Sequence, residues 1–314
     1  MSWHIKKRDF YLFSLKLVLL IVLFLFMNFD KALNVDYPNY LANYKNDWWQ
    51  FELGFESIAY PFKVFKSEFL SFWIFILVLE VILIAFLYRN NAIFLFAFPN
   101  LIFISQGFLG TQIRFGLAIS LFLVVFSFFY KKKHFWLISL FPILFHNAII
   151  VVYFLSNSVR YLLNDKRKIF LKNNLFWLGI FIVASVGISI LMNHILMATG
   201  YYYYVGTKYQ EGKSISSLIY LFISMLLLLF LLCRKSNAQY SEYIYFGFVI
   251  VVFSLIFSKS SVISGRFTLV YTMLEPFVLY YFYQNIGKKK YFFPIFILYC
   301  VICYIKLITV DFKV

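Results

Sequence analysis

The chain has 314 residues, of which 63% are hydrophobic, 24% are aromatic and only 13% are charged. A water-soluble domain usually carries about 25% charged residues, so the composition excludes an ordinary soluble protein. The formal net charge of +16 could suit a nucleic acid, but the Lys and Arg residues stand in short clusters between apolar runs. Such clusters are typical of signals for membrane topology, and no nucleic-acid partner is expected.

Apolar runs long enough to cross a bilayer recur along the whole chain and predict an all-α, polytopic transmembrane helical bundle. We expect about 10–12 membrane segments, each of roughly 20 residues, in a single integral-membrane domain, 1–314. The first run follows Lys6-Lys7-Arg8 and lacks a small-residue cleavage site, which favours an uncleaved helix over a signal peptide. The expected spans cover about residues 10–27, 69–88, 92–108, 114–130, 175–197, 217–233, 242–258, 267–284 and 291–308.

The apolar stretch from His134 to Ser158 allows two readings. It is either one helix interrupted at Pro142, or two half-length pieces that turn back near His146. A single crossing would put most of the later basic clusters outside, against the rule that cytoplasmic loops carry the excess of Lys and Arg. We therefore predict a re-entrant hairpin near His146, buried among other helices because irregular backbone cannot face lipid. Two short full crossings would give the same topology.

This topology, with the N-terminus inside, collects the unusual polar residues on the outer side. They lie in an outer polar loop at 28–68, in an outer loop at 198–216 that carries Lys208, and at the outer ends of helices. A site built from them would face away from the cytoplasm, where ATP and nucleotide sugars are found. The sequence also lacks a phosphate-binding loop of the Walker type.

Arg114 stands at the mouth of an apolar helix, where an arginine is costly. The 16 residues from Phe115 to Tyr130 rise ~24 Å as a helix, against a hydrocarbon core of roughly 30 Å. To span, the helix draws Arg114 and Gln112 into the edge of the bilayer, which makes Arg114 a functional candidate. The alternative is a snorkelling side chain that only anchors the helix end. Arg266 also stands at the predicted outer start of a helix, and two guanidinium groups facing one cavity would suit a pyrophosphate.

Carboxylates and aromatic rings alternate in the first outer loop, as in sites that bind carbohydrate. Asp36 and Glu52 are candidates to accept hydrogen bonds from hydroxyls or to remove a proton. Trp48 and Trp49 fit an interfacial aromatic belt better than a sugar platform. His146, at the proposed turn, could transfer a proton near neutral pH, or could be a hydrogen-bonded packing residue.

Two carboxylates and three cysteines fall inside apolar runs. Glu80 and Glu275 lie near mid-helix, where each needs a partner or a protonated state, and we expect structural roles for both. The cysteines are interpreted as small apolar filler, because a closed zinc site needs four ligands and no histidine is near them. No metal site is expected. The cysteines are Cys233, Cys300 and Cys303.

Four short motifs occur in order along the chain and resemble one known family. They are Asp36-Tyr37-x-x-Tyr40, Glu52-x-Gly54-Phe55, Ile113-Arg114-Phe115-Gly116-Leu117-Ala118 and Leu144-Phe145-His146-Asn147-Ala148. This pattern is similar to the EpsG-like group of Wzy-type polysaccharide polymerases. Phe115 and Asn147 depart from it, since the family often has Gln and Ser at these two places.

The resemblance implies an integral-membrane glycosyltransferase. Because no residue pattern indicates a metal site, metal independence is predicted and no cofactor is expected, and a single displacement would invert the anomeric centre. Such an enzyme joins oligosaccharide repeat units carried on undecaprenyl pyrophosphate, at the outer face of the bacterial cytoplasmic membrane. A flippase and a chain-length regulator would be its partners, along with the lipid bilayer. The expected catalytic residues are Arg114, His146, Asp36 and Glu52. The expected substrate-binding residues are Arg266, Tyr37, Tyr40, Gln112 and Lys208. The alternatives are a lipid-linked saccharide flippase or a membrane O-acyltransferase acting on the glycan.

Overall fold

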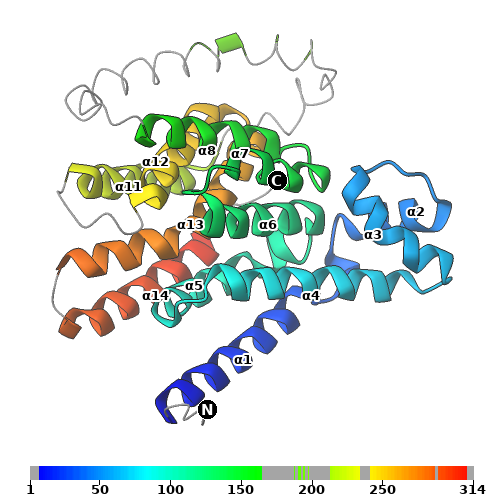
Figure 1. Cartoon of the computed structure of the whole chain (residues 1–314), viewed down its shortest axis with the longest axis horizontal. Coiled ribbons are helices and arrows are strands. Elements are labelled where there is room, and N and C mark those ends of the chain that lie inside the picture. The colour runs from blue at the N-terminus through cyan, green and yellow to red at the C-terminus, as the bar shows by residue number, and fades with distance from the viewer. Residues whose placement is uncertain are drawn as a thin grey trace. The chain divides into compact units, whose positions relative to one another are not determined.

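The computed structural model describes residues 7–164, 213–233, 241–286 and 289–309, together with residues 187, 190, 191, 194 and 197. The chain divides into two compact units, Met1–Phe154 and Leu155–Val314, and each is described by itself. Within the described residues the regular structure is helical, without strands, and six helices are long and apolar enough to cross a membrane (Figure 1). The predicted all-α, multi-pass membrane fold is confirmed.

The first unit contains four of the nine predicted spans and two helices that the sequence did not predict. The outer segment after the first helix, predicted only as a polar loop, folds into two helices of its own. The α-helices are α1 (Lys7–Met27), α2 (Tyr37–Asn46), α3 (Leu53–Val64), α4 (Phe69–Leu87), α5 (Asn91–Ile104), α6 (Ile113–Phe129), α7 (Phe135–Ile138) and α8 (Ile149–Asn164), which continues into the second unit. Short turns of other helix types cover Lys31–Leu33, Ser105–Leu109 and Phe141–Leu144.

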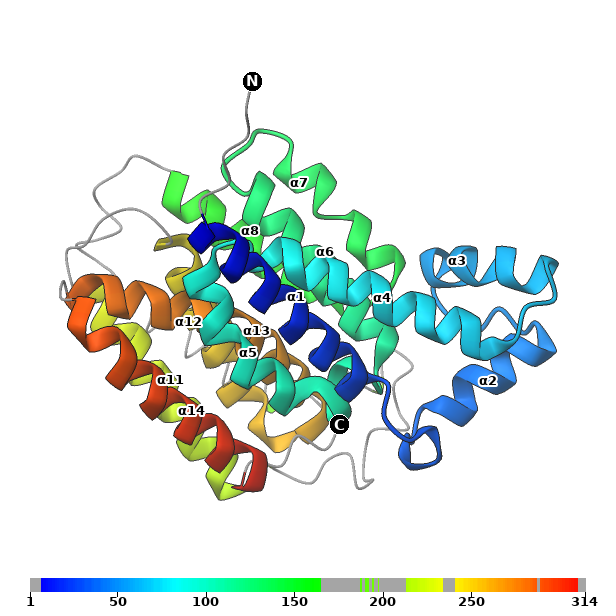
Figure 2. The same ribbon diagram turned by 90° about the horizontal axis from the view of Figure 1, so that it is seen from below.

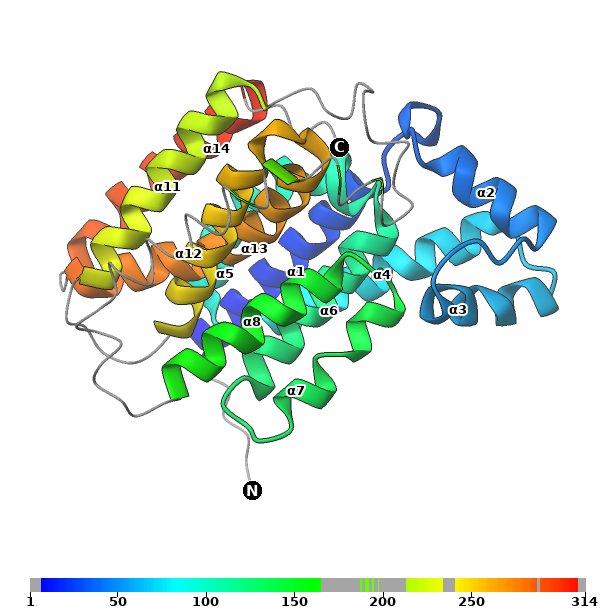
Figure 3. The same cartoon turned by 90° about the horizontal axis from the view of Figure 1, so that it is seen from above.

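In the first unit α4 lies beside α6, and α1 packs against α4 and α5 (Figures 2 and 3). The short helices α2 and α3 lie together at the N-terminal end of α4 in all three views. Lys16, inside the apolar run of α1, donates from Nζ to the backbone oxygen of Tyr88 at 2.9 Å. Because the carbonyl groups at the end of α4 lack helical partners, the lysine satisfies them while its own charge is solvated.

The turn that leads into α6 is fixed against the end of α1. A Cβ at Gly110 would lie only 2.2 Å from the backbone oxygen of Met27, so no larger residue fits. The side chain of Asn34 donates from Nδ2 to the backbone oxygen of Gly110 at 2.9 Å. These two contacts set where α6 begins, and therefore where Arg114 stands.

The apolar stretch from His134 to Ser158 is interrupted around Pro142 and His146, the two places at which the sequence allowed a break. Helix α7 and the turn Phe141–Leu144 come before the break, and α8 begins at Ile149, whose N–H donates to the backbone oxygen of His146 at 3.1 Å. The first limb, 135–144, would rise only ~15 Å as an α-helix, about half of a hydrocarbon core. The stretch is therefore interrupted, as both readings of the sequence allowed, and the choice between a single crossing and a re-entrant path stays a prediction.

The second unit contains α11 (Ile215–Cys233), α12 (Ser241–Ile256), α13 (Ser261–Ile286) and α14 (Phe292–Thr309), with short turns at Phe257–Lys259 and Lys289–Tyr291. Helix α12 packs against both α11 and α13 (Figure 1). The span expected at about 175–197 falls largely outside the described residues.

Helix α13 starts earlier than predicted, which corrects the position of Arg266. The sequence placed Arg266 at the start of a helix, but α13 begins at Ser261, so Arg266 lies inside it. The polar residues that suggested a loop are satisfied within the helix pair: the hydroxyl of Ser254 on α12 donates to the backbone oxygen of Ser264 on α13 at 2.8 Å. Serine hydroxyls that bond neighbouring backbone groups are compatible with a buried helix.

Glu275, near the middle of α13, has the kind of partner that its position demanded. Its Oε2 lies 2.7 Å from Nζ of Lys306 on α14 and accepts a hydrogen bond from the hydroxyl of Tyr299 at 2.9 Å. Its Oε1 accepts from the hydroxyl of Tyr220 on α11 at 3.2 Å. The Glu275–Lys306 ion pair and its tyrosine partners connect α11, α13 and α14. These contacts are compatible with the structural role expected for Glu275.

Among the described residues Glu80 of α4 has no comparable partner. Both of its carboxyl oxygens are buried without a hydrogen bond among the described residues. The carboxyl group fills the space left by Gly116 on α6, where a Cβ would lie 2.7 Å from Oε1. Gly116 therefore lets α4 and α6 approach closely around a carboxyl group.

Candidate functional site

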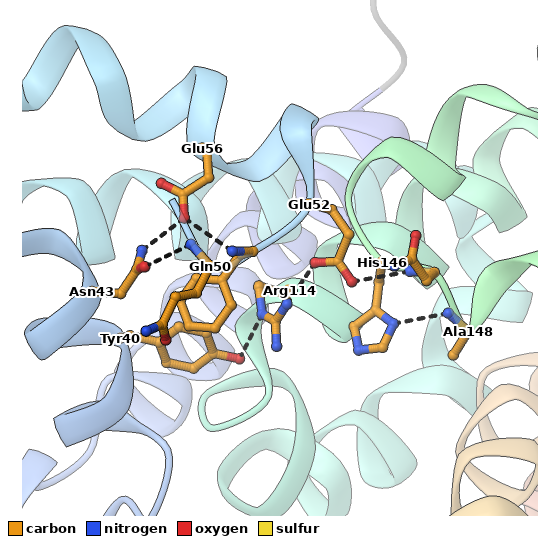
Figure 4. Close-up of polar contacts among 10 residues, drawn as sticks. Tyr40, Asn43, Gln50, Glu52, Glu56, Arg114, His146 and Ala148 are labelled. Carbon is orange, nitrogen blue, oxygen red and sulfur yellow. Dashed lines mark hydrogen bonds and ion pairs between the residues drawn. The ribbon is translucent and has the colours of Figure 1, made fainter. Parts of the chain in front are cut away.

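Arg114 is the centre of a polar cluster in the first unit (Figure 4). Its Nη1 lies 2.5 Å from Oε2 of Glu52, and its Nε donates to the hydroxyl of Tyr40 at 3.4 Å. The guanidinium carbon lies 3.9 Å from the centre of the Phe51 ring. Among the described residues Nη2 makes no hydrogen bond. One corner of the guanidinium group is thus unused, and the side chain keeps 20% of its accessible surface.

Tyr40 on α2 forms one wall of the cluster. Its ring packs within 6 Å of Phe51, Phe55 and Trp73, measured between ring centres. Burial raises the pKa of the Tyr40 phenol to about 12, although the positive charge of Arg114 acts in the opposite direction. At neutral pH Tyr40 is therefore a hydroxyl that can accept from Arg114 and donate to another group.

Glu52 bridges Arg114 to the turn before α8. Its Oε1 accepts a hydrogen bond from the backbone N–H of Asn147 at 3.1 Å, while Oε2 faces Arg114. Glu52 stands at the N-cap position of α3 in an extended conformation, but its side chain makes no capping bond to that helix. The carboxylate is consequently free to point toward the arginine.

A buried carboxylate holds the loop that presents Phe51 and Glu52. Glu56 on α3 is fully buried, and its Oε1 accepts from Nδ2 of Asn43 at 2.7 Å and from the backbone N–H of Phe51 at 3.3 Å. Asn43 in turn accepts the backbone N–H of Gln50 at 3.0 Å through Oδ1. The loop between α2 and α3 is therefore fixed from within, which preorganises the residues that contact Arg114.

Lys63 neutralises the carboxylates behind this loop. Its Nζ lies 3.4 Å from Glu56 and 2.8 Å from the exposed Asp47. The hydrogen bond from Lys63 lowers the pKa of Asp47. Asp47 also takes a left-handed conformation, with φ of 52°, where α2 ends.

His146 lies beside the cluster, on the side of Glu52 away from Tyr40 (Figure 4). Its Nδ1 accepts a hydrogen bond from the backbone N–H of Ala148 at 3.1 Å, and its ring packs edge-on against Phe115. A neutral imidazole that accepts at Nδ1 carries its proton on Nε2. In this arrangement Nδ1 is engaged by Ala148, and the part of His146 in proton transfer stays a prediction.

The other predicted site residues have different places. Asp36 precedes α2, where its backbone oxygen accepts from the N–H of Tyr40 at 3.2 Å, and its charge adds to the raised pKa of that phenol. Tyr37 packs against Phe69 and Trp73 of α4, which makes it part of the wall. 

Gln112 precedes α6, and within the described part of the chain its side chain has no hydrogen bond to Arg114 or Glu52. Arg266 is half-buried in α13 of the second unit, and its pairing with Arg114 stays a prediction. Lys208 lies outside the described residues.

Sequence reasoning missed four contributors to the cluster. Phe51 stacks on the arginine, Asn43 and Glu56 brace the loop, and Asn147 offers a backbone N–H. The only sequence signal was the density of aromatic and acidic residues at 47–56, because a backbone contact leaves no mark on residue identity. Asn43 and Glu56 are 13 positions apart, which no helical or strand periodicity connects.

The cluster is suited to an anion. A partly exposed guanidinium with an unused corner binds phosphate or carboxylate oxygens. Among the described residues no group of three or more His, Cys, Asp or Glu side chains is arranged to hold a metal ion.

The fold and cluster describe a multi-pass membrane protein with a preorganised arginine in its N-terminal half. The chain belongs to the EpsG family, whose model matches residues 15–313, nearly the whole length. That membership is consistent with a polysaccharide polymerase. Searches of curated proteins and of solved structures found no match.

Proposed function

We propose that the protein is a membrane glycosyltransferase that polymerises lipid-linked oligosaccharide repeat units. In this proposal undecaprenyl pyrophosphate carries the donor and acceptor units, and the reaction takes place at the outer face of the bacterial cytoplasmic membrane. Family membership supports the reaction class, and the arginine cluster supports a pyrophosphate-bearing substrate. A flippase would deliver the units and a chain-length regulator would act alongside.

The observation that carries the proposal is the state of Arg114. Its guanidinium is largely enclosed, stacked on Phe51 and oriented by Tyr40 and Glu52, while Nη2 is unused. A fork held this rigidly needs little reorganisation when charge develops on the leaving pyrophosphate, which is how electrostatic preorganisation accelerates reactions. A guanidinium that only anchored a helix end would not need such bracing.

The reaction would proceed by a single displacement. An acceptor hydroxyl loses its proton to a base, its oxygen bonds to the anomeric carbon of the donor, and the bond from that carbon to the pyrophosphate oxygen breaks. The lipid pyrophosphate leaves with the electron pair, Arg114 stabilises it, and the anomeric centre inverts. Arg266 and Lys208 remain proposed contributors to substrate binding.

The test is the length of the glycan made in cells that carry Arg114→Ala. We expect single repeat units in place of long chains, because losing an engaged cation costs on the order of 3 kcal/mol or more of transition-state stabilisation. The matched control is Arg89→Ala, which removes an exposed arginine that also faces an aromatic ring, 4.4 Å from the centre of Phe128. The control should keep long chains.

Two results would contradict the proposal at equal membrane expression. Long chains from Arg114→Ala would remove the arginine from the reaction. Loss of all surface repeat units, with lipid-linked units trapped inside, would favour a flippase instead.

A further inference from the structure

Glu52 already occupies the position that a substrate anion would take on Arg114. An arginine offers two edges for bidentate binding, one formed by Nη1 and Nη2 and the other by Nε and Nη2. Glu52 holds Nη1 at 2.5 Å and Tyr40 holds Nε at 3.4 Å. Neither edge is fully open, so a bidentate anion must displace one of these two partners.

We propose that Glu52 is an internal anion that the donor pyrophosphate displaces from Arg114, and that the released carboxylate is the base for the acceptor hydroxyl. This inference rests on the proposed function and adds to it an assignment of the base and an order of events. Donor binding comes first and makes the base available. The carboxylate is therefore held inactive by its ion pair until a donor is present.

The charges of the cluster favour such an exchange. Among the described residues Arg114 is the single cation within hydrogen-bonding distance of Glu52, whose side chain keeps only 12% of its surface. A pyrophosphate would bring more negative charge to the same cation than one carboxylate does. Two anions beside one guanidinium repel each other, so the donor weakens the hold on Glu52 even where it enters on the Nε edge.

Glu52 would not leave the site after the exchange. Its Oε1 still accepts from the backbone N–H of Asn147 at 3.1 Å, and its backbone is fixed at the start of α3. Glu56 independently braces the neighbouring residue by accepting the N–H of Phe51. The carboxylate can thus turn one oxygen away from Arg114 while the residue keeps its place.

Release also opens one oxygen of Glu52 to the acceptor hydroxyl, because Oε2 no longer faces Arg114 while Oε1 stays bonded to Asn147. The proton of the acceptor hydroxyl moves to the freed oxygen of Glu52 as the new glycosidic bond forms and the pyrophosphate leaves. His146 is less suited to this step, because its Nδ1 already accepts the N–H of Ala148 and its neutral ring presents Nε2–H.

The experiment measures binding of inorganic pyrophosphate to the full-length protein in nanodiscs. The variants are Glu52→Gln, Glu52→Ala and Arg114→Ala, each shown to be monodisperse. The matched control is Glu68→Gln, which removes one negative charge from an exposed residue before α4 that makes no side-chain capping bond. We expect both Glu52 variants to bind at least about tenfold more tightly than the natural protein, Glu68→Gln to bind like it, and Arg114→Ala to bind undetectably.

A second measurement, the length of the glycan, distinguishes a base at Glu52 from a residue that only packs. Glu52→Gln should bind pyrophosphate more tightly and yet make no long glycan, whereas loss of a merely structural contact would weaken both properties. One result would overturn the exchange and leave the proposed function in place: Arg114→Ala binds no pyrophosphate, and neither Glu52 variant binds it more tightly than the natural protein. If Arg114→Ala binds pyrophosphate as tightly as the natural protein, the proposed function is overturned, and the exchange with it.

Discussion

Arg114 shows why the kind of cation matters at this site. The guanidinium bonds Tyr40 through Nε and Glu52 through Nη1, and it stacks on Phe51 with its flat face. An ammonium is a compact point charge without a fork or a flat face, so it cannot make these contacts together. The three contacts come from three parts of one planar group.

We predict that Arg114→Lys fails to restore polymer length. The charge is kept, but bidentate contact with a phosphate group and stacking on Phe51 are lost, so activity should fall roughly 100-fold or more. Glycan length and the rate of chain growth in membranes with matched protein levels are the measurements. Activity within about threefold of the natural protein would mean that only the charge of Arg114 is used.

The buried pair in the second unit allows a sharper test of a single residue. Lys306→Met should destabilise the protein by about 3–5 kcal/mol, because it leaves the Glu275 carboxyl without its cation among buried helices. Adding Glu275→Gln should recover much of the loss, since the remaining amide can still bond Tyr220 and Tyr299. Unfolding in detergent measures both variants. A double variant less stable than Lys306→Met would show that the pair is not the source of the effect.

At the scale of single residues, the sequence singled out residues that meet in the cluster but did not predict their contacts. Arg114 and His146 were singled out because polar residues in or beside an apolar run are costly. Glu52 was singled out as a carboxylate among aromatic rings, and Tyr40 through the family resemblance. Their partnership was not predicted, since Glu52 was expected to face sugar hydroxyls and instead pairs with Arg114. Residues 62 positions apart meet through tertiary packing alone, which a local pattern does not encode.

At the scale of elements, the contact between α3 and the turn Phe141–Leu144 links the two sides of the cluster. A Cβ at Gly54 would lie 2.8 Å from the backbone oxygen of Leu144. Glycine therefore allows α3 to touch backbone directly, and this approach brings Glu52 within reach of Asn147. The helix that carries one side of the site is positioned by the segment that carries the other.

We predict that Gly54→Ala shortens the glycan by more than its effect on stability would explain. The methyl group must push α3 away from rigid backbone, at a cost of about 1–3 kcal/mol, and the bond from Asn147 to Glu52 should lengthen. Gly107→Ala is the control, because a Cβ there would meet nothing within 4 Å. Glycan length and thermal unfolding are measured together. Equal effects of the two substitutions would remove the contact with Leu144 as the cause.

The loop between α2 and α3 should depend on Glu56 and not on Asp47. Glu56→Ala leaves Asn43 and the N–H of Phe51 without their buried acceptor, so unfolding should become easier by about 1–3 kcal/mol or more. Asp47→Ala removes an exposed partner of Lys63 and should change little. Thermal unfolding of both variants is the measurement, and an equal loss in the two would contradict this division of roles.

The sign of the pH effect follows from the same contacts. Lys63 lowers the pKa of Asp47 in the folded state, so this small stabilisation is present above the ordinary pKa of an aspartate and is lost as the pH falls. The natural protein should lose slightly more stability than Asp47→Ala when the pH is lowered through that range. The reverse ordering would show that the contact with Lys63 contributes nothing to folding.

The elements themselves were more predictable than their ends. Long apolar runs with basic clusters between them predicted α1, α4, α5, α6, α11, α12 and α14 closely. The start of α13 was predicted too late, because Ser264 satisfies its polar groups on α12 and so tolerates burial. Helices α2 and α3 were missed, since they are short and their aromatic and acidic residues lack the periodicity of a buried face.

At the scale of the whole molecule, the orientation of the chain decides what the site can react with. A cluster at the outer face meets lipid-linked glycans, whereas one at the inner face would meet nucleotide-activated sugars. Composition and the recurring apolar runs together predicted a multi-pass membrane protein, because a soluble chain is rarely 63% hydrophobic. Orientation was inferred from the placement of Lys and Arg, which is a statistical rule about insertion and not a property of the folded chain.

We predict that residues 28–68 lie outside and that the turn between α6 and α7 lies inside. In a chain freed of its natural cysteines, Lys45→Cys and Lys132→Cys would each supply one exposed thiol, on α2 and on that turn respectively. A membrane-impermeant maleimide should label Lys45→Cys on intact cells and Lys132→Cys only after permeabilisation. Three crossings, α4, α5 and α6, separate the two positions, and an odd number of crossings puts the two thiols on opposite sides of the membrane. Labelling of both thiols from outside would contradict these crossings. Labelling in the reverse order would keep the fold, but it would turn Arg114 and Glu52 toward the cytoplasm and leave the lipid-linked donor without its proposed site.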